Sequence, residues 1–332
     1  MAFQTSLLNI EKININVPTD YASLDVALKF LSNKYIYPST SVTINVAAGS
    51  YNFTNQISFN YRFGNNVSIL GDSSVTAKTV SSFSSVSGST GNWSCTYILS
   101  DVSGITTSCY IMLETLVGDS NKFIHQGCWK VTAINTTTKA VTVLNTYQGS
   151  SLPSSSITGG TATVQTTVFN FTNCNGLLIE KTYVLGMINN IAFVGNNNRS
   201  YNGITTSCGG YLNCGTGIGV SGFGNGILSI NGGFMDVNSV CASNNTIGFY
   251  SSSASYMNSQ YSTANGNLTY GFCSSSGSFL NCDYSTAKGN VMADYYASDM
   301  SLIRFYQRGN NNSPVINPSI NTTGNNNSII AG

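Results

Sequence analysis

The carboxylates are the side chains of this chain best suited to acid–base chemistry. There are twelve: Glu11, Asp20, Asp25, Asp72, Asp101, Glu114, Asp119, Glu180, Asp236, Asp283, Asp294 and Asp299. Cleavage of a glycosidic bond needs two carboxyl groups about 5 to 9.5 Å apart across the sugar. Asp236 and Asp283 lie close to two turns of a 23-residue repeat apart, and Asp294 and Asp299 lie within one turn. These four are the candidate catalytic residues, and a solvated acid near a turn is the alternative for each.

Tyrosines offer a second chemistry, because a flat ring can stack on a neutral sugar. Tyr261 and Tyr284 are 23 residues apart, so they would stack on adjacent turns of the repeat. If the residues that follow them face inward, the tyrosines form an outward aromatic strip, whereas the opposite phase buries them in the core. Tyr250 and Tyr296, with Cys273 between them, have the same ambiguity. These four tyrosines are the candidate glycan-binding residues.

Other reactive side chains are few. His125 is the single histidine, and a packing or hydrogen-bonding role is favoured over catalysis. Trp129 is expected to be a packing anchor. No calcium-type cluster of Asp occurs, and the Gly-rich segment 215–226 lacks the Lys and the helix of a nucleotide loop. We therefore expect no metal site and no cofactor.

The elements that position these residues come from an internal repeat. Residues 234–302 split into three blocks of 23 without gaps. Five columns keep their chemistry: Ser239, Ser262 and Ser285; Cys241, Ala264 and Ala287; Asn244, Asn267 and Asn290; Phe249, Phe272 and Tyr295; Tyr256, Phe279 and Leu302. The repeat is rich in Ser, Asn, Gly, Thr and Tyr, and these residue types disfavour the interior of a helix. The repeat therefore predicts a coil of short strands joined by turns.

Stacked coils would pair strand over strand at about 4.8 Å and place equivalent side chains above one another. The asparagine column then has two explanations, a ladder of hydrogen-bonded amides or a tolerance of left-handed turns. The fold class predicted is all-β: a right-handed parallel β-helix of about 23 residues per coil, with an N-terminal capping helix and an inserted small antiparallel β-domain.

Composition excludes several classes of function. Charged residues make up 8% of the 332 residues and the net charge is +1, so neither nucleic acid nor a membrane surface is an expected partner. The nine cysteines lack a short metal-binding spacing, and most are expected to be reduced. The N-terminus lacks a signal-peptide pattern, and no stretch of 18 apolar residues predicts membrane insertion.

Five parts are predicted along the chain. They are an N-terminal arm or attachment segment (1–18), a capping helix and first β-helix coils (19–71), an inserted β-domain (72–168), the main β-helix (169–310) and a C-terminal flap (311–332). The helix is expected over 19–35, with Thr19 or Asp20 as its cap and an apolar stripe that includes Val26. The segment INTTTKAV predicts a hairpin turn in the inserted domain.

The segments VPTDYASLDVALKFLSNK and VTINVAAGSYNFTNQISF resemble the cap and first coils of pectin-lyase-like β-helix proteins. The inserted segment HQGCWKVTAINTTTKAVTVLNT, the repeat YSTANGNLTYGFCSSSGSFLNCDYSTAKGN and the ending DYYASDMSLIRFY together resemble bacteriophage tail proteins. The resemblance implies a tail spike or tail fibre protein of the virion. It also implies a homotrimer that contacts host surface polysaccharide and other tail proteins. Long anchoring modules of tail spikes are missing, so the first eighteen residues or another tail protein would provide attachment.

The leading hypothesis is therefore a phage tail adhesin, which binds host cell-surface polysaccharide, folds in the host cytoplasm and resides in the virion tail. The alternative is a depolymerase tail spike, a polysaccharide hydrolase or lyase. A bacterial surface or secreted lyase is disfavoured by the expected reduced cysteines and the missing signal peptide. Whether the chain is an enzyme stays open, with binding favoured over catalysis.

Overall fold

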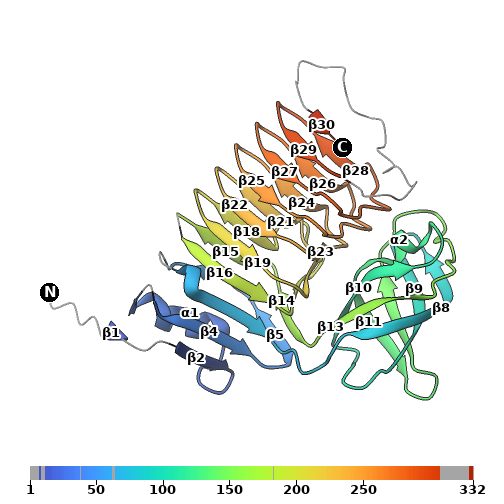
Figure 1. Cartoon of the computed structure of the whole chain (residues 1–332), viewed down its shortest axis with the longest axis horizontal. Coiled ribbons are helices and arrows are strands. Elements are labelled where there is room, and N and C mark those ends of the chain that lie inside the picture. The colour runs from blue at the N-terminus through green and yellow to red at the C-terminus, as the bar shows by residue number, and fades with distance from the viewer. Residues whose placement is uncertain are drawn as a thin grey trace.

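The computed structural model describes residues 7–8, 12–37, 39–61, 64–181, 183–306 and 329–331. A parallel β-helix forms most of the molecule, and an antiparallel β-barrel leaves it between two coils (Figure 1). The predicted all-β class, with a parallel β-helix, a helix near the N-terminus and an inserted antiparallel domain, is confirmed.

Three parallel sheets build the β-helix, and five coils contribute one strand to each. The ten-stranded sheet contains β2 (Lys12–Val17), β4 (Ser41–Val46), β7 (Val67–Gly71), β16 (Val184–Asn189), β19 (Tyr211–Cys214), β22 (Phe234–Val237), β25 (Tyr256–Asn258), β27 (Phe279–Asn281), β29 (Leu302–Arg304) and β30 (Ile329–Ala331). The seven-stranded sheet contains β6 (Ile57–Phe59), β15 (Leu177–Glu180), β18 (Ile204–Ser207), β21 (Asn225–Ile230), β24 (Ile247–Ser251), β26 (Tyr270–Ser274) and β28 (Ala293–Ala297). The five-stranded sheet contains β5 (Gly49–Phe53), β14 (Thr167–Phe171), β17 (Ile191–Gly195), β20 (Ile218–Ser221) and β23 (Val240–Ala242).

The first of the three repeat blocks is one residue shorter than predicted. Phe234 pairs with Tyr256, Tyr256 with Phe279 and Phe279 with Leu302, so the coils span 22, 23 and 23 residues. The gap-free alignment is therefore wrong in the first half of block one, because the missing residue falls between Asn245 and Ile247.

In three predicted columns, the residue from block one is therefore the next one along the chain. Cys241 pairs with Thr263 and not with Ala264. Val240 replaces Ser239 in the serine column, because the Val240 N–H donates to the Ser262 hydroxyl (3.2 Å). The columns Phe249–Phe272–Tyr295 and Tyr256–Phe279–Leu302 are confirmed.

The asparagine ladder begins at Asn245, not at Asn244. The Asn245 N–H donates to Asn267 Oδ1 (2.9 Å), and Asn267 Nδ2 donates to Asn290 Oδ1 (3.0 Å). Asn244 has a left-handed backbone (φ 62°), as do Gly266 and Gly289 at the equivalent turn. The hydrogen-bonded ladder therefore starts at Asn245, whereas the tolerance of a left-handed turn applies to its neighbour Asn244.

One continuous core runs through the coils and ends under helix α1 (Leu24–Ser32). The helix starts later than predicted, and neither Thr19 nor Asp20 caps it. The Asp20 carboxylate instead accepts a hydrogen bond from the Asn16 N–H (2.7 Å), which closes the turn after β2. Val26, predicted in the apolar stripe, is 44% exposed, because Leu28 takes its place in the buried face.

The inserted domain is a closed barrel in the order β10-β11-β12-β9-β8-β13. Its strands are β8 (Lys78–Ser89), β9 (Asn92–Leu99), β10 (Tyr110–Val117), β11 (Gly127–Asn135), β12 (Ala140–Asn145) and β13 (Gly159–Gln165). The predicted hairpin joins β11 to β12. Short helices η1 (Gly64–Asn66) and α2 (Lys122–His125) lie outside the sheets, and β1 (Leu7–Leu8) pairs with β3 (Tyr35–Ile36).

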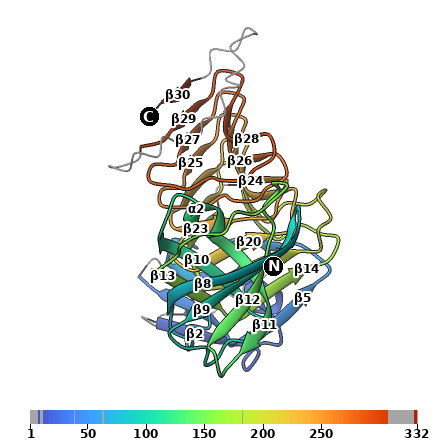
Figure 2. The ribbon, with the colours of Figure 1, turned by 90° about the vertical axis from the view of Figure 1, so that its right-hand side faces the viewer.

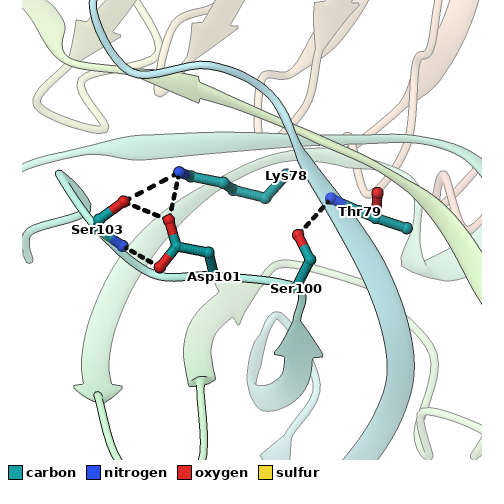
Figure 3. A network of polar contacts seen from close by, with 5 residues as sticks. All are labelled: Lys78, Thr79, Ser100, Asp101 and Ser103. Carbon is teal, nitrogen blue, oxygen red and sulfur yellow. Dashed lines mark hydrogen bonds and ion pairs between the residues drawn. The ribbon is translucent and has the colours of Figure 1, made fainter.

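Polar contacts fix the first barrel strand to the loop after β9 (Figure 3). Lys78, which is buried, places its ammonium 2.8 Å from Asp101 and 3.2 Å from Ser103. The Ser103 N–H and hydroxyl also donate to the Asp101 carboxylate. The Lys78 ammonium and Ser103 together hold the pKa of Asp101 below its usual range.

The barrel lies against the five-stranded sheet (Figure 2). Gln165 Nε2 donates to the Gly217 carbonyl (2.8 Å), and Asn265 Nδ2 donates to the Phe123 and Gln126 carbonyls (2.7 and 2.8 Å). A Cβ atom at Gly219 would lie 2.2 Å from Cys128 Sγ, so only glycine permits this approach. The two parts therefore have a closely packed interface.

The division of the chain into five parts remains a prediction, but the strands can be located within those parts. β2 pairs along β4 although its residues were assigned to the arm, and the barrel strands lie within 72–168. Of the predicted flap, only 329–331 lie within the described residues, where β30 pairs with β29. Each of the nine cysteines is a free thiol.

Candidate carbohydrate-binding site

Tyr261 and Tyr284 occupy the turns that follow β25 and β27 on adjacent coils. Their rings stack with centroids 5.0 Å apart and planes 10° apart, and their side chains are 59% and 36% exposed. Tyr306 meets Tyr284 edge-on at 5.6 Å. The phase that the sequence left open is therefore outward for both tyrosines.

The neighbouring serines fix this outward phase. Ser262 and Ser285 are buried, and their hydroxyls donate to the carbonyls of Val237 (2.9 Å) and Ser259 (2.7 Å). Both tyrosines have left-handed backbones, with φ of 56° and 60°, as Ser239 does at the equivalent turn of the preceding coil (φ 57°). The left-handed conformation, which costs a residue with a side chain roughly 1 kcal/mol or more, therefore belongs to this turn of the coil.

A second aromatic ladder lies on the outer face of the same ten-stranded sheet. It is formed by the first residues of successive strands: Tyr211, Phe234, Tyr256, Phe279 and Leu302. Tyr256 and Phe279 stack at 5.3 Å with a 13° interplanar angle. The repeat predicted the register of Tyr256, Phe279 and Leu302 but not their place on the outer face, and the 23-residue spacing from Tyr211 to Phe234 was a signal for the longer ladder.

A polar strip separates the two ladders. Asp236, Asn258, Asn281 and Arg304 succeed one another in register from β22 to β29. Asn258 Nδ2 donates to Asp236 (3.1 Å), and Asn281 Nδ2 donates to Asn258 Oδ1 (3.0 Å). The outer face therefore presents aromatic rings on both sides of a row of amides and charges.

Asp283 lies at the edge of this strip and is only 2% exposed. Its Oδ2 atom is 3.2 Å from the Arg304 guanidinium and accepts a hydrogen bond from Gln260 Nε2 (3.5 Å). Its Oδ1 atom has no hydrogen-bond partner among the described residues. Asp283 is thus an acid held by Arg304, and one buried oxygen of it is unpaired.

The four candidate catalytic acids occupy different environments. Asp283 is two coils from Asp236 and follows β27 by two residues, since Asn281 is the residue in register with Asp236. Burial raises the pKa of Asp294 to about 6, and Asn290 Nδ2 donates to its carboxylate (2.8 Å). Asp299 is exposed in the turn after β28 and accepts a hydrogen bond from Ser298 (3.2 Å).

Two solved phage tailspike proteins are similar to this chain in structure. The tailspike protein gp49 from Pseudomonas phage LKA1 is 12% identical, with a TM-score of 0.31, over 87% of this chain and 56% of that one. The tailspike gp61 from Pseudomonas phage phi297 is 9% identical, with a TM-score of 0.17, over 86% of this chain and 68% of that one. The chain thus spans about half the length of the first tailspike. In sequence, it matches no protein-family model and no curated protein.

Tyr250 and Tyr296 lie on the seven-stranded sheet, so they face a different side of the β-helix from Tyr261 and Tyr284. Both pair in register with Cys273, as the sequence predicted. Tyr250 is half-buried and its hydroxyl is 2.9 Å from Ser275 Oγ. Tyr296, also half-buried, stacks on Tyr270 at 4.4 Å.

His125 and Trp129 pack inside the barrel, in agreement with the predicted packing roles. His125 Nε2 donates to the Pro153 carbonyl (3.1 Å), so Nδ1 accepts from the Tyr97 hydroxyl (2.7 Å). Burial lowers the pKa of His125 to about 4. Within the described ranges, no three His, Cys, Asp or Glu side chains gather as metal ligands, and no helix has the length and apolar character needed to cross a membrane.

Proposed function

We propose that this chain is a bacteriophage tail adhesin that binds host cell-surface polysaccharide on the outer face of its ten-stranded sheet. The exposed stack of Tyr261 on Tyr284 is the observation that carries the proposal. Both rings remain partly exposed, so a sugar that stacks on them would remove further apolar area from water. Each buried ring contributes about 25 cal/mol per Å² of apolar area removed from water.

The row of amides beside the rings suits the hydroxyl groups of a sugar. Asn258 is partly exposed, and its amide keeps a second N–H and a second lone pair beyond its bonds within the strip, whereas Asn281 is only 8% exposed. The strip runs along the helix axis, as the aromatic ladders do. A polysaccharide chain that runs along the axis would meet one ring and one amide at each coil. The net charge of +1 agrees with recognition by stacking and hydrogen bonds more than by charge.

Binding is favoured over cleavage because the acids of the strip are already engaged. Arg304 holds Asp283, while Asn238 Nδ2 (2.6 Å) and Asn258 donate to Asp236. A depolymerase function is the alternative, and the binding and cleavage experiment distinguishes it from an adhesin.

The sequence resemblance to phage tail proteins supports the remaining parts of the proposal. These are a homotrimer, attachment to other tail proteins, folding in the host cytoplasm and residence in the virion tail. Light scattering tests the oligomer: a particle of three 35.2 kDa chains is expected, and a monomer at high concentration would contradict it.

The direct experiment measures binding and cleavage on one panel of purified bacterial surface polysaccharides. Biolayer interferometry reports binding, and chromatography of the same mixtures reports released oligosaccharides. We expect binding to at least one polysaccharide without release. Release of oligosaccharides would replace the adhesin with a depolymerase, and no binding across the panel would overturn both.

A further inference from the structure

A pocket of about 300 Å³ lies where the barrel meets the β-helix. The barrel contributes Tyr110, Lys130 and Leu144 to its lining, and the β-helix contributes Ser221 and Asn244. Ligand pockets of proteins measure about 300–1,000 Å³, so this one suits a single small ring and not a chain of sugars.

The charges around the pocket are positive. Lys130 is exposed on β11, and it forms no ion pair within the described part of the chain. No carboxylate belongs to the described residues that line the pocket. An unpaired ammonium at the edge of a partly enclosed pocket attracts an anion, because field lines concentrate between the low-dielectric walls.

A second cation, Arg199, contacts a residue of the pocket lining. Arg199 is partly buried, and one guanidinium nitrogen donates to Asn244 Oδ1 (2.9 Å), while the other donates to the carbonyls of Asn244 and Phe223. Burial lowers the pKa of Arg199, and it too lacks an ion pair in the described ranges. Arg199 therefore adds positive potential and holds Asn244 in place.

The amide of Asn244 is also fixed from its other side. Asn244 Nδ2 donates to Asn197 Oδ1 (3.2 Å) and to Ser221 Oγ (3.4 Å), which both line the pocket. The close packing of Gly219 on Cys128 keeps the barrel wall against this cluster. The polar groups thus converge before any ligand arrives, which lowers the entropy lost on binding.

One acid lies near this interface and must be considered. Glu114 contacts Thr163 (3.1 Å) and acts electrostatically on Cys128, which is part of the lining. Burial raises the pKa of Glu114 to about 7, so it carries only part of a negative charge at neutral pH. The two cations therefore outweigh it.

We propose that this pocket binds a small anionic ligand with hydroxyl groups, of which a single carboxylate-bearing sugar is the best match. Lys130 would pair with the carboxylate. Asn244 Oδ1 would accept a hydrogen bond from one ring hydroxyl, and the Ser221 hydroxyl would donate to another. The site is separate from the tyrosine ladder, so the inference goes beyond the proposed function and does not depend on it.

Titration by NMR with four probes tests the chemistry of the site. The probes are D-glucuronate, D-glucose, acetate and inorganic phosphate, each added to the full chain. We expect glucuronate to bind more tightly than the other three, with shifts at Ser221 and Asn244. If glucose bound as tightly as glucuronate, the carboxylate would contribute nothing to the affinity. If acetate or phosphate bound as tightly, the sugar ring would contribute nothing. Either result overturns the proposal.

Variants locate the site. Lys130→Ala should weaken glucuronate binding about tenfold or more, which is the usual loss for one charge-assisted contact. The control Lys139→Ala removes an ammonium from the β11–β12 turn and should leave the affinity unchanged. Unaltered affinity in Lys130→Ala would overturn the assignment. Glucuronate binding should also persist in the Tyr261→Ala/Tyr284→Ala double variant, so the outcomes for the two sites are distinguishable.

Discussion

The rings of Tyr261 and Tyr284 stack 5.0 Å apart on adjacent coils, which is close to the spacing of the strands that carry them. The stack is therefore a direct product of the β-helix register. Both rings remain exposed, and both backbones are left-handed. The pair is therefore an exposed feature of the coil turns and not part of the core.

Truncation of the stack should weaken polysaccharide binding. Tyr261→Ala and Tyr284→Ala should each lower the affinity about 3- to 10-fold, the range expected for one aromatic contact. Tyr261→Phe keeps the ring and should lose less than Tyr261→Ala. Interferometry on the polysaccharide that binds best provides the measurement. Val26→Ala, which truncates an exposed apolar residue of α1, is the control and should bind like the wild type.

The asparagine ladder should be the polar feature most costly to remove. Asn267 is fully buried, accepts from the Asn245 N–H and donates to the Ala242 carbonyl (3.1 Å). Asn267→Ala would leave both groups unpaired, so we expect about 2–5 kcal/mol of lost stability by denaturant unfolding.

An exposed asparagine provides the matched control for that measurement. Asn196 Nδ2 donates to Asn173 Oδ1 (3.1 Å) and Asn196 Oδ1 accepts from the Asn198 N–H (3.3 Å), both at the surface. Because water can replace exposed partners, Asn196→Ala should cost about 0.5 kcal/mol or less. Equal effects of the two substitutions would show that the ladder contributes no more than a surface amide.

Glu114 should make stability fall as pH rises. Burial raises its pKa from 4.5 to about 7, so the folded chain binds more protons than the unfolded chain between these values. Stability from this group is therefore complete below about pH 4.5 and is lost as pH rises to about 7, by about 3 kcal/mol at most.

Glu114→Gln should remove this loss. Melting temperatures of variant and wild type should be similar near pH 4.5, and the variant should melt higher at pH 8. Glu180→Gln, which removes a surface carboxylate paired with Lys181, should show no such trend. A difference between Glu114→Gln and wild type that does not change with pH would contradict the buried position of this carboxyl.

The Lys78–Asp101 ion pair should stabilise the start of the barrel. Asp101→Asn would leave the buried Lys78 ammonium with Ser103 alone, so amides of β8 and of the loop after β9 should exchange hydrogen faster. The pKa of Asp101 is held low, so its contribution is present above the usual range of Asp and is lost as pH falls through the lowered value. Asp25→Asn on α1 is the control, and identical exchange in both variants would contradict the role of the pair.

The sequence predicted the architecture because the residues that recur in the repeat include those that face the core. Phe249, Phe272 and Tyr295 recur at 23 residues and stack in the interior, so the coil and its length could be read directly. The hairpin of the barrel followed from alternating residues on both sides of a polar turn.

Other features depend on contacts that a single sequence does not reveal. The one-residue shortening before Phe249 was hidden because Asn244 and Asn245 are identical in type. The late start of α1 follows from the Asp20–Asn16 contact, which removes Asp20 from the helix. The barrel–helix pocket joins Lys130 to Asn244, residues from two parts of the chain that no spacing connects.

A crystal structure of the chain with an oligosaccharide from the polysaccharide that it binds would test the central proposal most directly. We predict a sugar ring packed on Tyr261 or Tyr284 at about 4 Å, with hydroxyl groups bonded to Asn258 or Asn281. An oligosaccharide bound elsewhere, with both tyrosine rings bare, would contradict the account.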